Sequence, residues 1–133
     1  MTREETIKVL AILKAAYPNA YKGMTREEAQ GTVTVWSMQF AVFPVEVVLL
    51  AVNKIIASST FAPSISEVKE KMRGMYWELW GILKENETVH NLTDVQETQY
   101  LRMLSAIEPL RASYNNEPAI SDILGAYNQL YLN

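Results

Sequence analysis

Few side chains in this 133-residue sequence could carry out chemistry, and their spacing does not bring them together. His90 is the single histidine, and cysteine is absent. A metal site or a catalytic histidine needs a cluster of ligands or acids, so we interpret His90 as a solvated loop residue. The acid pairs Glu4-Glu5 and Glu27-Glu28 are adjacent, so their members do not face each other on a helix. They are typical of helix starts, where the dipole favours acids, and do not predict catalytic carboxylates.

No glycine-rich loop is present that could hold a phosphate group. The five glycines are scattered singly, so hydrolysis of a nucleoside triphosphate is not expected. The densest basic cluster consists of Lys69, Lys71 and Arg73. Glu67 and Glu70 interrupt it, which is typical of an ordinary solvated face rather than of a DNA contact. The sequence therefore predicts a protein that is not an enzyme and that uses no cofactor and no metal.

Charge is divided unevenly along the chain, whose net charge is −3. Residues 1–84 hold ten Lys or Arg against eight Asp or Glu, whereas residues 85–133 hold two against seven. This shift favours a boundary near residue 85, between a compact helical domain (1–84) and a C-terminal helical segment (85–133) that is mobile or docked on a partner. The acidic segment is not expected to bind phosphates.

Neither export nor membrane insertion is indicated by the sequence. The first residues combine acids with lysines that interrupt the apolar positions, which does not match a secretory signal. No run approaches the roughly 20 apolar residues of a membrane span. The lack of cysteine fits a reducing compartment, so we expect a cytoplasmic protein that does not bind membranes.

A helix at residues 44–57 is the element around which the others should pack. Val, Leu, Ile and Ala fill almost every turn, and Glu46 and Asn53 interrupt them on one face. A helix that is apolar nearly all round must be surrounded by other elements. Its length of about a dozen residues favours a helix over a buried strand. We predict an all-α fold: a compact bundle of about four helices around this buried central helix, followed by a linker and one or two C-terminal helices.

The other helices of the bundle are predicted from capping spacing and apolar stripes. Capping boxes at Thr2, Thr25 and Ser64 should begin helices at residues 2–17, 25–40 and 64–84. Before the last of them, Phe61 and Pro63 predict a rigid corner, which we place in the core. The expected buried stripes are Ile7, Leu10, Leu13 and Ala16, then Ala29, Val33, Trp36 and Phe40, then Ile65, Val68, Met72, Tyr76, Leu79 and Leu83.

Beyond residue 84 the pattern is more polar. Residues 85–91 lack periodicity and predict a linker. Thr93 with Gln96 should cap another helix, which Pro109 kinks or ends. Its apolar positions are Tyr100, Leu101, Leu104 and Ile107. Pro118 then begins a last predicted helix.

Two surfaces are candidate partner-binding sites. Trp77 and Trp80, beside Tyr76, cannot both be buried unless the C-terminal helices pack there; otherwise they form a partner surface. The second surface is the apolar face of the tail. A helix of that length is marginal alone, so it docks either on its own domain or in a groove on another protein. This tail face consists of Ile120, Ile123, Leu124, Tyr127, Leu130 and Tyr131.

Roughly residues 1–75 resemble the small phage helicase loader/inhibitor family. The resemblance implies a non-enzymatic adaptor with a compact helical N-terminal domain and a mobile C-terminal part that orders on its partner. The residues that carry it are Thr2-Arg3-Glu4-Glu5, Tyr17-Pro18, the helix with Trp36, the apolar helix, and Phe61-x-Pro63-x-Ile65-x-Glu67-Val68.

The resemblance also implies the partner, a hexameric replicative helicase of the DnaB type inside a bacterial host cell. Family members restrain this helicase and deliver it to DNA at the phage origin, where an origin-binding protein is a further expected partner. We expect the tail face, with Trp77 and Trp80, to bind the helicase. The alternative is a small helical DNA-binding regulator or origin-binding accessory protein, and the acidic balance argues against it.

Overall fold

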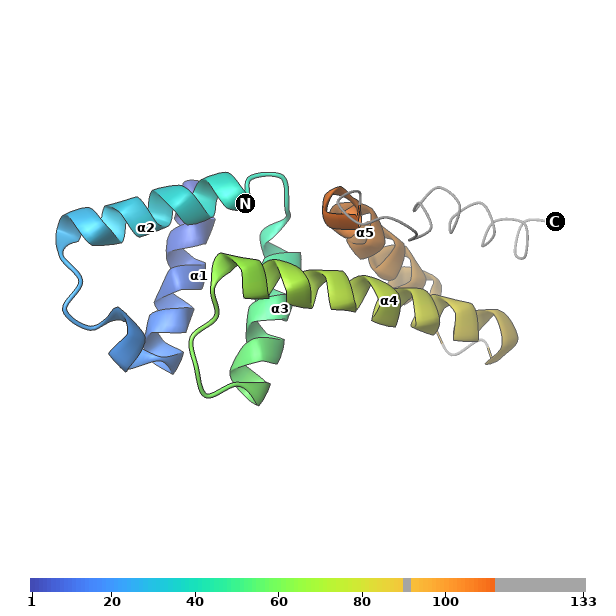
Figure 1. Cartoon of the computed structure of the whole chain (residues 1–133). Coiled ribbons are helices and arrows are strands. Elements are labelled where there is room, and N and C mark those ends of the chain that lie inside the picture. The colour runs from blue at the N-terminus through green and yellow to red at the C-terminus, as the bar shows by residue number, and fades with distance from the viewer. Residues whose placement is uncertain (90–91, 112–133) are drawn as a thin grey trace. The chain divides into compact units, whose positions relative to one another are not determined.

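The computed structural model describes residues 1–89 and 92–111, and these form helices joined by short connections (Figure 1). No strand occurs in that part of the chain, so the predicted all-α bundle is confirmed. The chain divides into two compact units, Met1–Met72 and a second one that begins at Arg73. The elements are α1 (Arg3–Ala16), the 3-10 helix η1 (Pro18–Tyr21), α2 (Arg26–Gln39), α3 (Val45–Ser58), α4 (Ile65–Val89) and α5 (Asp94–Arg111).

The helix starts follow the capping spacing of the sequence. At α1, the Glu5 N–H donates to Thr2 Oγ1 at 3.2 Å, and the Thr2 N–H donates to Glu5 Oε1 at 2.8 Å. That second bond, from the Thr2 backbone, is the main reason why the pKa of Glu5 is lowered. At α4, the Glu67 N–H donates to Ser64 Oγ at 3.2 Å. These caps satisfy amides that the first helical turn leaves unpaired.

Helix α3 lies in the core of the first unit, as predicted. Its buried side chains are Val47, Val48, Ala51, Val52 and Ile55. The prediction that it is covered on all sides was wrong, because Leu50 is 40 % exposed. An apolar helix in a unit of this size has too few neighbours to cover its whole circumference.

Helix α1 buries a different face from the predicted one. It packs against α2 and α3 through Thr6, Val9 and Leu13, which are all fully buried. Of the other predicted core residues, Ile7 is 49 % exposed and Ala16 is also exposed. Two apolar stripes lie next to each other on this helix, and the packing of α3 selects the one that contains Val9.

Helix α2 contributes only the end of its predicted stripe to the core. Trp36 and Phe40 are buried, whereas Val33 is half-buried and Ala29 is exposed. The rings of Trp36 and Phe40 lie 5.4 Å apart. The first turns of α4 cover this end, because Lys69 Nζ lies 5.7 Å from the Phe40 ring centroid.

The basic cluster at the start of α4 is not the solvated face that the sequence predicted. Lys69 is half-buried and donates to Gln39 Oε1 at 2.7 Å. Arg73 is 9 % exposed and belongs to the second unit. The aliphatic stems of such side chains cover apolar surface while their charged ends bond polar groups.

In the second unit, α4 runs five residues past the predicted end at Lys84. It continues to Val89, so residues 85–89 of the predicted linker are helical. Asn86 is 3 % exposed, and its Oδ1 accepts the Leu92 N–H at 2.9 Å. A buried amide that caps the next connection explains why this polar stretch is structured. The predicted domain boundary near residue 85, drawn from charge, stays a prediction.

Helix α5 begins as predicted and ends later. The Gln96 N–H donates to Thr93 Oγ1 at 3.2 Å, and the Thr93 N–H donates to Gln96 Oε1 at 3.0 Å. Leu104 and Ile107 are buried. The helix runs through Pro109 to Arg111, so the proline does not end it. The helix predicted from Pro118 lies outside the described residues.

Candidate functional site

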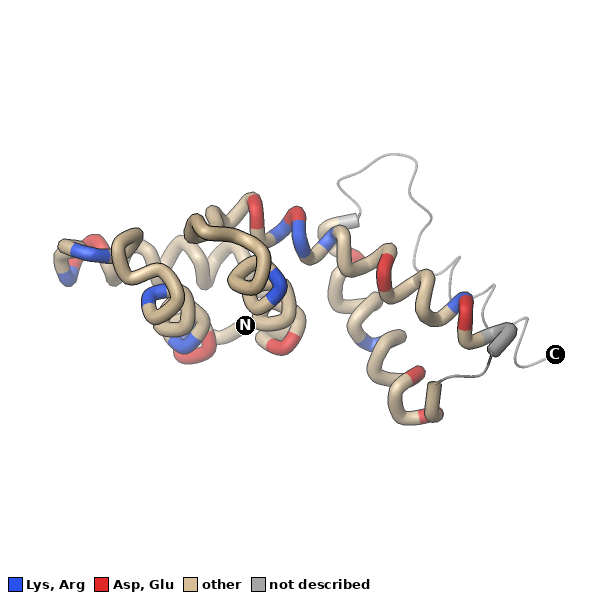
Figure 2. The backbone as a smooth tube through the Cα atoms, turned by 90° about the horizontal axis from the view of Figure 1, so that it is seen from below, with Lys and Arg blue, Asp and Glu red and all other residues tan. Residues whose placement is uncertain are grey.

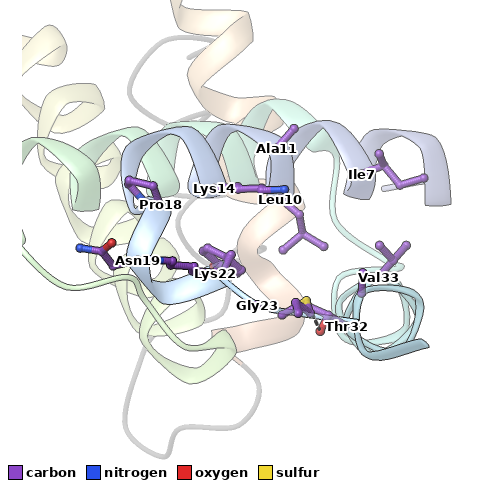
Figure 3. A pocket seen from close by; sticks show the side chains of 13 residues that line it. Ile7, Leu10, Ala11, Lys14, Pro18, Asn19, Lys22, Gly23, Thr32 and Val33 are labelled. Carbon is purple, nitrogen blue, oxygen red and sulfur yellow. Dashed lines mark hydrogen bonds between the residues drawn. The ribbon is translucent and has the colours of Figure 1, made fainter. Parts of the chain in front are cut away.

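An open groove of about 600 Å³ lies in the first unit, between α1, η1 and the start of α2. Most of its wall is apolar (Figure 3). Its lining residues are Ile7, Leu10, Ala11, Lys14, Pro18, Asn19, Tyr21, Lys22, Gly23, Met24, Ala29, Thr32 and Val33. The volume falls within the roughly 300–1,000 Å³ of typical binding pockets.

Two helices and the connection between them give the groove its shape. Leu10 points from α1 toward α2, and Val33 faces it from α2 (Figure 3). The chain leaves η1 and reaches α2 through Gly23, whose φ of 76° is in the left-handed region. A side chain would strain that conformation, so glycine is favoured at this turn. The groove therefore depends on backbone geometry that the sequence specifies locally.

The charged side chains of the groove are both basic. Lys14 comes from α1 and Lys22 follows η1, and both are exposed. None of the thirteen lining residues, all in the described part of the chain, is acidic. Tyr21 is half-buried at the same place, and its burial raises the pKa of its phenol, with a smaller contribution from Tyr17. The groove therefore combines apolar walls with a positive field.

The exposed Phe61 marks a second surface, at the corner between α3 and α4. Its side chain is 80 % exposed, so the prediction that it lies in the core was wrong. Pro63 is buried, and the Tyr17 hydroxyl donates to the Ser59 carbonyl at 2.8 Å. Ser59 Oγ also accepts the Phe61 N–H at 3.2 Å. Buried proline and hydrogen bonds hold the corner, and the phenylalanine ring projects from it.

Of the residues predicted to bind a partner, Trp77 and Trp80 lie on α4 in the second unit. Both are half-buried, and their ring centroids lie 6.0 Å apart, edge to face. Lys84 Nζ lies 4.5 Å from the centroid of Trp80, which is a cation–π distance. The predicted tail face, Ile120, Ile123, Leu124, Tyr127, Leu130 and Tyr131, lies outside the described residues.

Chemistry on a bound substrate has no visible basis in the described part of the chain. Residues 1–89 and 92–111 contain no group of His, Cys, Asp and Glu that could hold a metal ion. Basic and acidic residues alternate along these helices instead of forming a basic stripe (Figure 2). Nor does any described helix have the length and apolarity needed to cross a bilayer. The groove and the exposed corner suit the binding of a protein better than catalysis.

The fold and these surfaces define a small helical protein built for binding other macromolecules. The family model for the N-terminal domain of the phage gene 39 protein, a helicase loader/inhibitor, matches residues 1–69, which is more than half of the chain. The protein therefore belongs to this family of phage helicase loader/inhibitor proteins, and it interacts with a helicase. The match ends inside α4, close to the end of the first unit at Met72. Neither a curated protein nor a solved structure matches the chain.

Sequence reasoning did not find the groove. It assigned Ile7, Leu10 and Val33 to the core, and it did not single out the two lysines. The signal that could have found the groove was on α1, where Val9 and Ile12 widen the stripe of Ile7 and Leu10 beyond what one neighbouring helix can cover. A helix with an apolar arc that wide either is buried all round or offers its surplus face to a partner.

Proposed function

We propose that this protein is a non-enzymatic adaptor that binds a hexameric replicative helicase of the DnaB type and loads it, inhibits it, or does both during phage DNA replication. The observation that carries this proposal is the family match over residues 1–69. The adaptor would act in the cytoplasm of the bacterial host, with a phage origin-binding protein as a further partner.

The organisation of the chain supports an adaptor. The family match covers nearly the whole first unit, and a second unit follows from Arg73 onward. Two linked binding units raise the effective concentration of each for the same assembly, which suits a protein that brings a helicase to a second component. We propose that the second unit makes the main helicase contact through Trp77, Trp80 and the tail face.

Indole rings suit such a contact. Trp77 and Trp80 are half-buried, so each keeps apolar surface that a partner can cover. Tryptophan is enriched among the residues that dominate binding energy, because a single ring buries a large area at low entropic cost. The edge-to-face pair also holds both rings in place before binding. Pre-organisation of this kind reduces the cost of association.

Co-elution of the purified protein with the replicative helicase of its host tests the proposal. The two would be mixed with ATP and Mg²⁺ and analysed by size exclusion with light scattering, beside a version that ends at Glu117. A shift of the full-length protein alone into the helicase peak supports the adaptor and assigns the contact to the tail. A shift of both versions supports the adaptor and moves the contact to the first 117 residues. If neither shifts, the proposed partner is wrong.

A further inference from the structure

Helix α1 carries two apolar stripes, and only one of them is buried. Thr6, Val9 and Leu13 are fully buried in the core of the first unit. Ile7 is 49 % exposed and Leu10 is half-buried, and both line the groove. Apolar surface gathered in a concave site, rather than scattered singly, marks a place where another molecule binds.

The charges around the groove restrict what can bind there. Lys14 and Lys22 bring two ammonium groups to an apolar wall, and no acid accompanies them among the lining residues that the structure describes. Electrostatic complementarity between surfaces decides partner choice and the rate of encounter. A ligand with apolar side chains alone would leave these charges unused, whereas one with a carboxylate would pair with them.

We infer that the groove docks a short amphipathic segment of the partner protein, with apolar side chains between Leu10 and Val33 and a carboxylate near Lys14 or Lys22. A volume of about 600 Å³ accommodates a few side chains, so the occupant is a segment and not a domain. Met24 in the wall is flexible enough to fit different apolar side chains.

This inference rests on the proposed function for the identity of the partner, the helicase. It adds a contact in the first unit to the contacts proposed for the second unit. Two contacts on one helicase would give the compact first unit a binding role of its own, beyond that of a spacer. That role depends on the groove, so the test addresses the groove directly.

The first test fills the groove without changing the core. Ala29 is exposed and lines the groove, so Ala29→Trp places a large ring in the space while α2 keeps its buried face. Ala57→Trp is the matched control, because Ala57 is an exposed helical alanine of the first unit that does not line the groove. Full-length variants would be titrated with purified helicase. We expect Ala29→Trp to weaken binding at least about fivefold and Ala57→Trp to leave it unchanged.

The second test reverses one charge. Lys22→Glu in the groove is compared with Lys8→Glu, which changes an exposed lysine outside it. We expect the first to weaken helicase binding at low salt and the second to have little effect, with the difference shrinking as salt rises. Circular dichroism would verify that all four variants are folded.

A photoreactive residue at position 29 would then identify the bound segment by mass spectrometry. A crosslinked helicase peptide with apolar residues and at least one acid supports the inference. If the wild-type protein co-elutes with the helicase but the groove variants bind as tightly as their controls, the groove inference is wrong and the proposed function stands. If the wild-type protein does not bind the helicase, both fail.

Discussion

The Tyr17 hydroxyl donates a hydrogen bond to the Ser59 carbonyl across 42 positions of sequence, at 2.8 Å. It joins the end of α1 to the end of α3, and so fixes the corner from which Phe61 projects. The same tyrosine adds to the raised pKa of Tyr21 in the groove. One side chain thus connects both exposed surfaces of the first unit.

Removing this hydroxyl should destabilise the protein modestly. Tyr17→Phe leaves a carbonyl without its donor, and we expect a loss of about 1 kcal/mol in the free energy of unfolding. Urea unfolding followed by circular dichroism measures it. Tyr21→Phe is the control and should change stability less; equal losses in both variants would show that the bond to Ser59 contributes nothing.

Truncation of Phe61 should not affect stability, although phenylalanines are usually core residues. At 80 % exposure, the ring of Phe61 has little to lose, and we expect Phe61→Ala to stay within about 0.5 kcal/mol of wild type. Phe40→Ala, at a fully buried position, should cost about 3–5 kcal/mol. Comparable melting temperatures for the two variants would contradict the structure.

Asn86 should stabilise the connection from α4 to α5. Asn86→Ala leaves the Leu92 N–H without its acceptor at a part-buried place, and we expect a cost of about 1–3 kcal/mol. Hydrogen exchange of the Leu92 amide is the direct measurement, and exchange should accelerate in the variant. Thr98→Ala, which removes an exposed hydroxyl from α5, should leave that amide protected.

The capping box of α1 should make stability depend on pH. Because the folded-state pKa of Glu5 is lowered, its carboxylate stabilises the folded state at pH values above its ordinary pKa. This contribution is lost as the pH falls through the lowered pKa. The stability difference between wild type and Glu5→Ala should therefore be present at neutral pH and vanish in acid. A difference that does not change with pH would exclude this cause.

The helices were predictable because their signals are local. Capping at Thr2, Ser64 and Thr93, and the apolar run of α3, depend on residues within one turn of each other. The family resemblance was visible from the same residues, and the family match confirms it. Long polar stretches were less reliable: residues 85–89 look like a linker, and only the bond from Leu92 shows why Asn86 is buried.

Which face of a helix is buried was not predictable from one sequence. On α1, the stripes through Val9 and through Leu10 are equally apolar, and only the position of α3 distinguishes them. Phe61 presents the same difficulty, because its neighbour Pro63 is buried and it is not. The groove follows from such choices between neighbouring faces, so it could not be derived before the helices were placed.

The groove is walled by helices whose other faces form the core, so folding of the first unit is enough to shape it. A cavity that exists before its natural occupant arrives is open to other molecules of the right size. A small apolar acid that binds between Leu10 and Lys14 would compete there without entering the helicase itself. Phage replication would then become sensitive to a drug-like compound aimed at the viral adaptor, while the host's replication machinery is left intact.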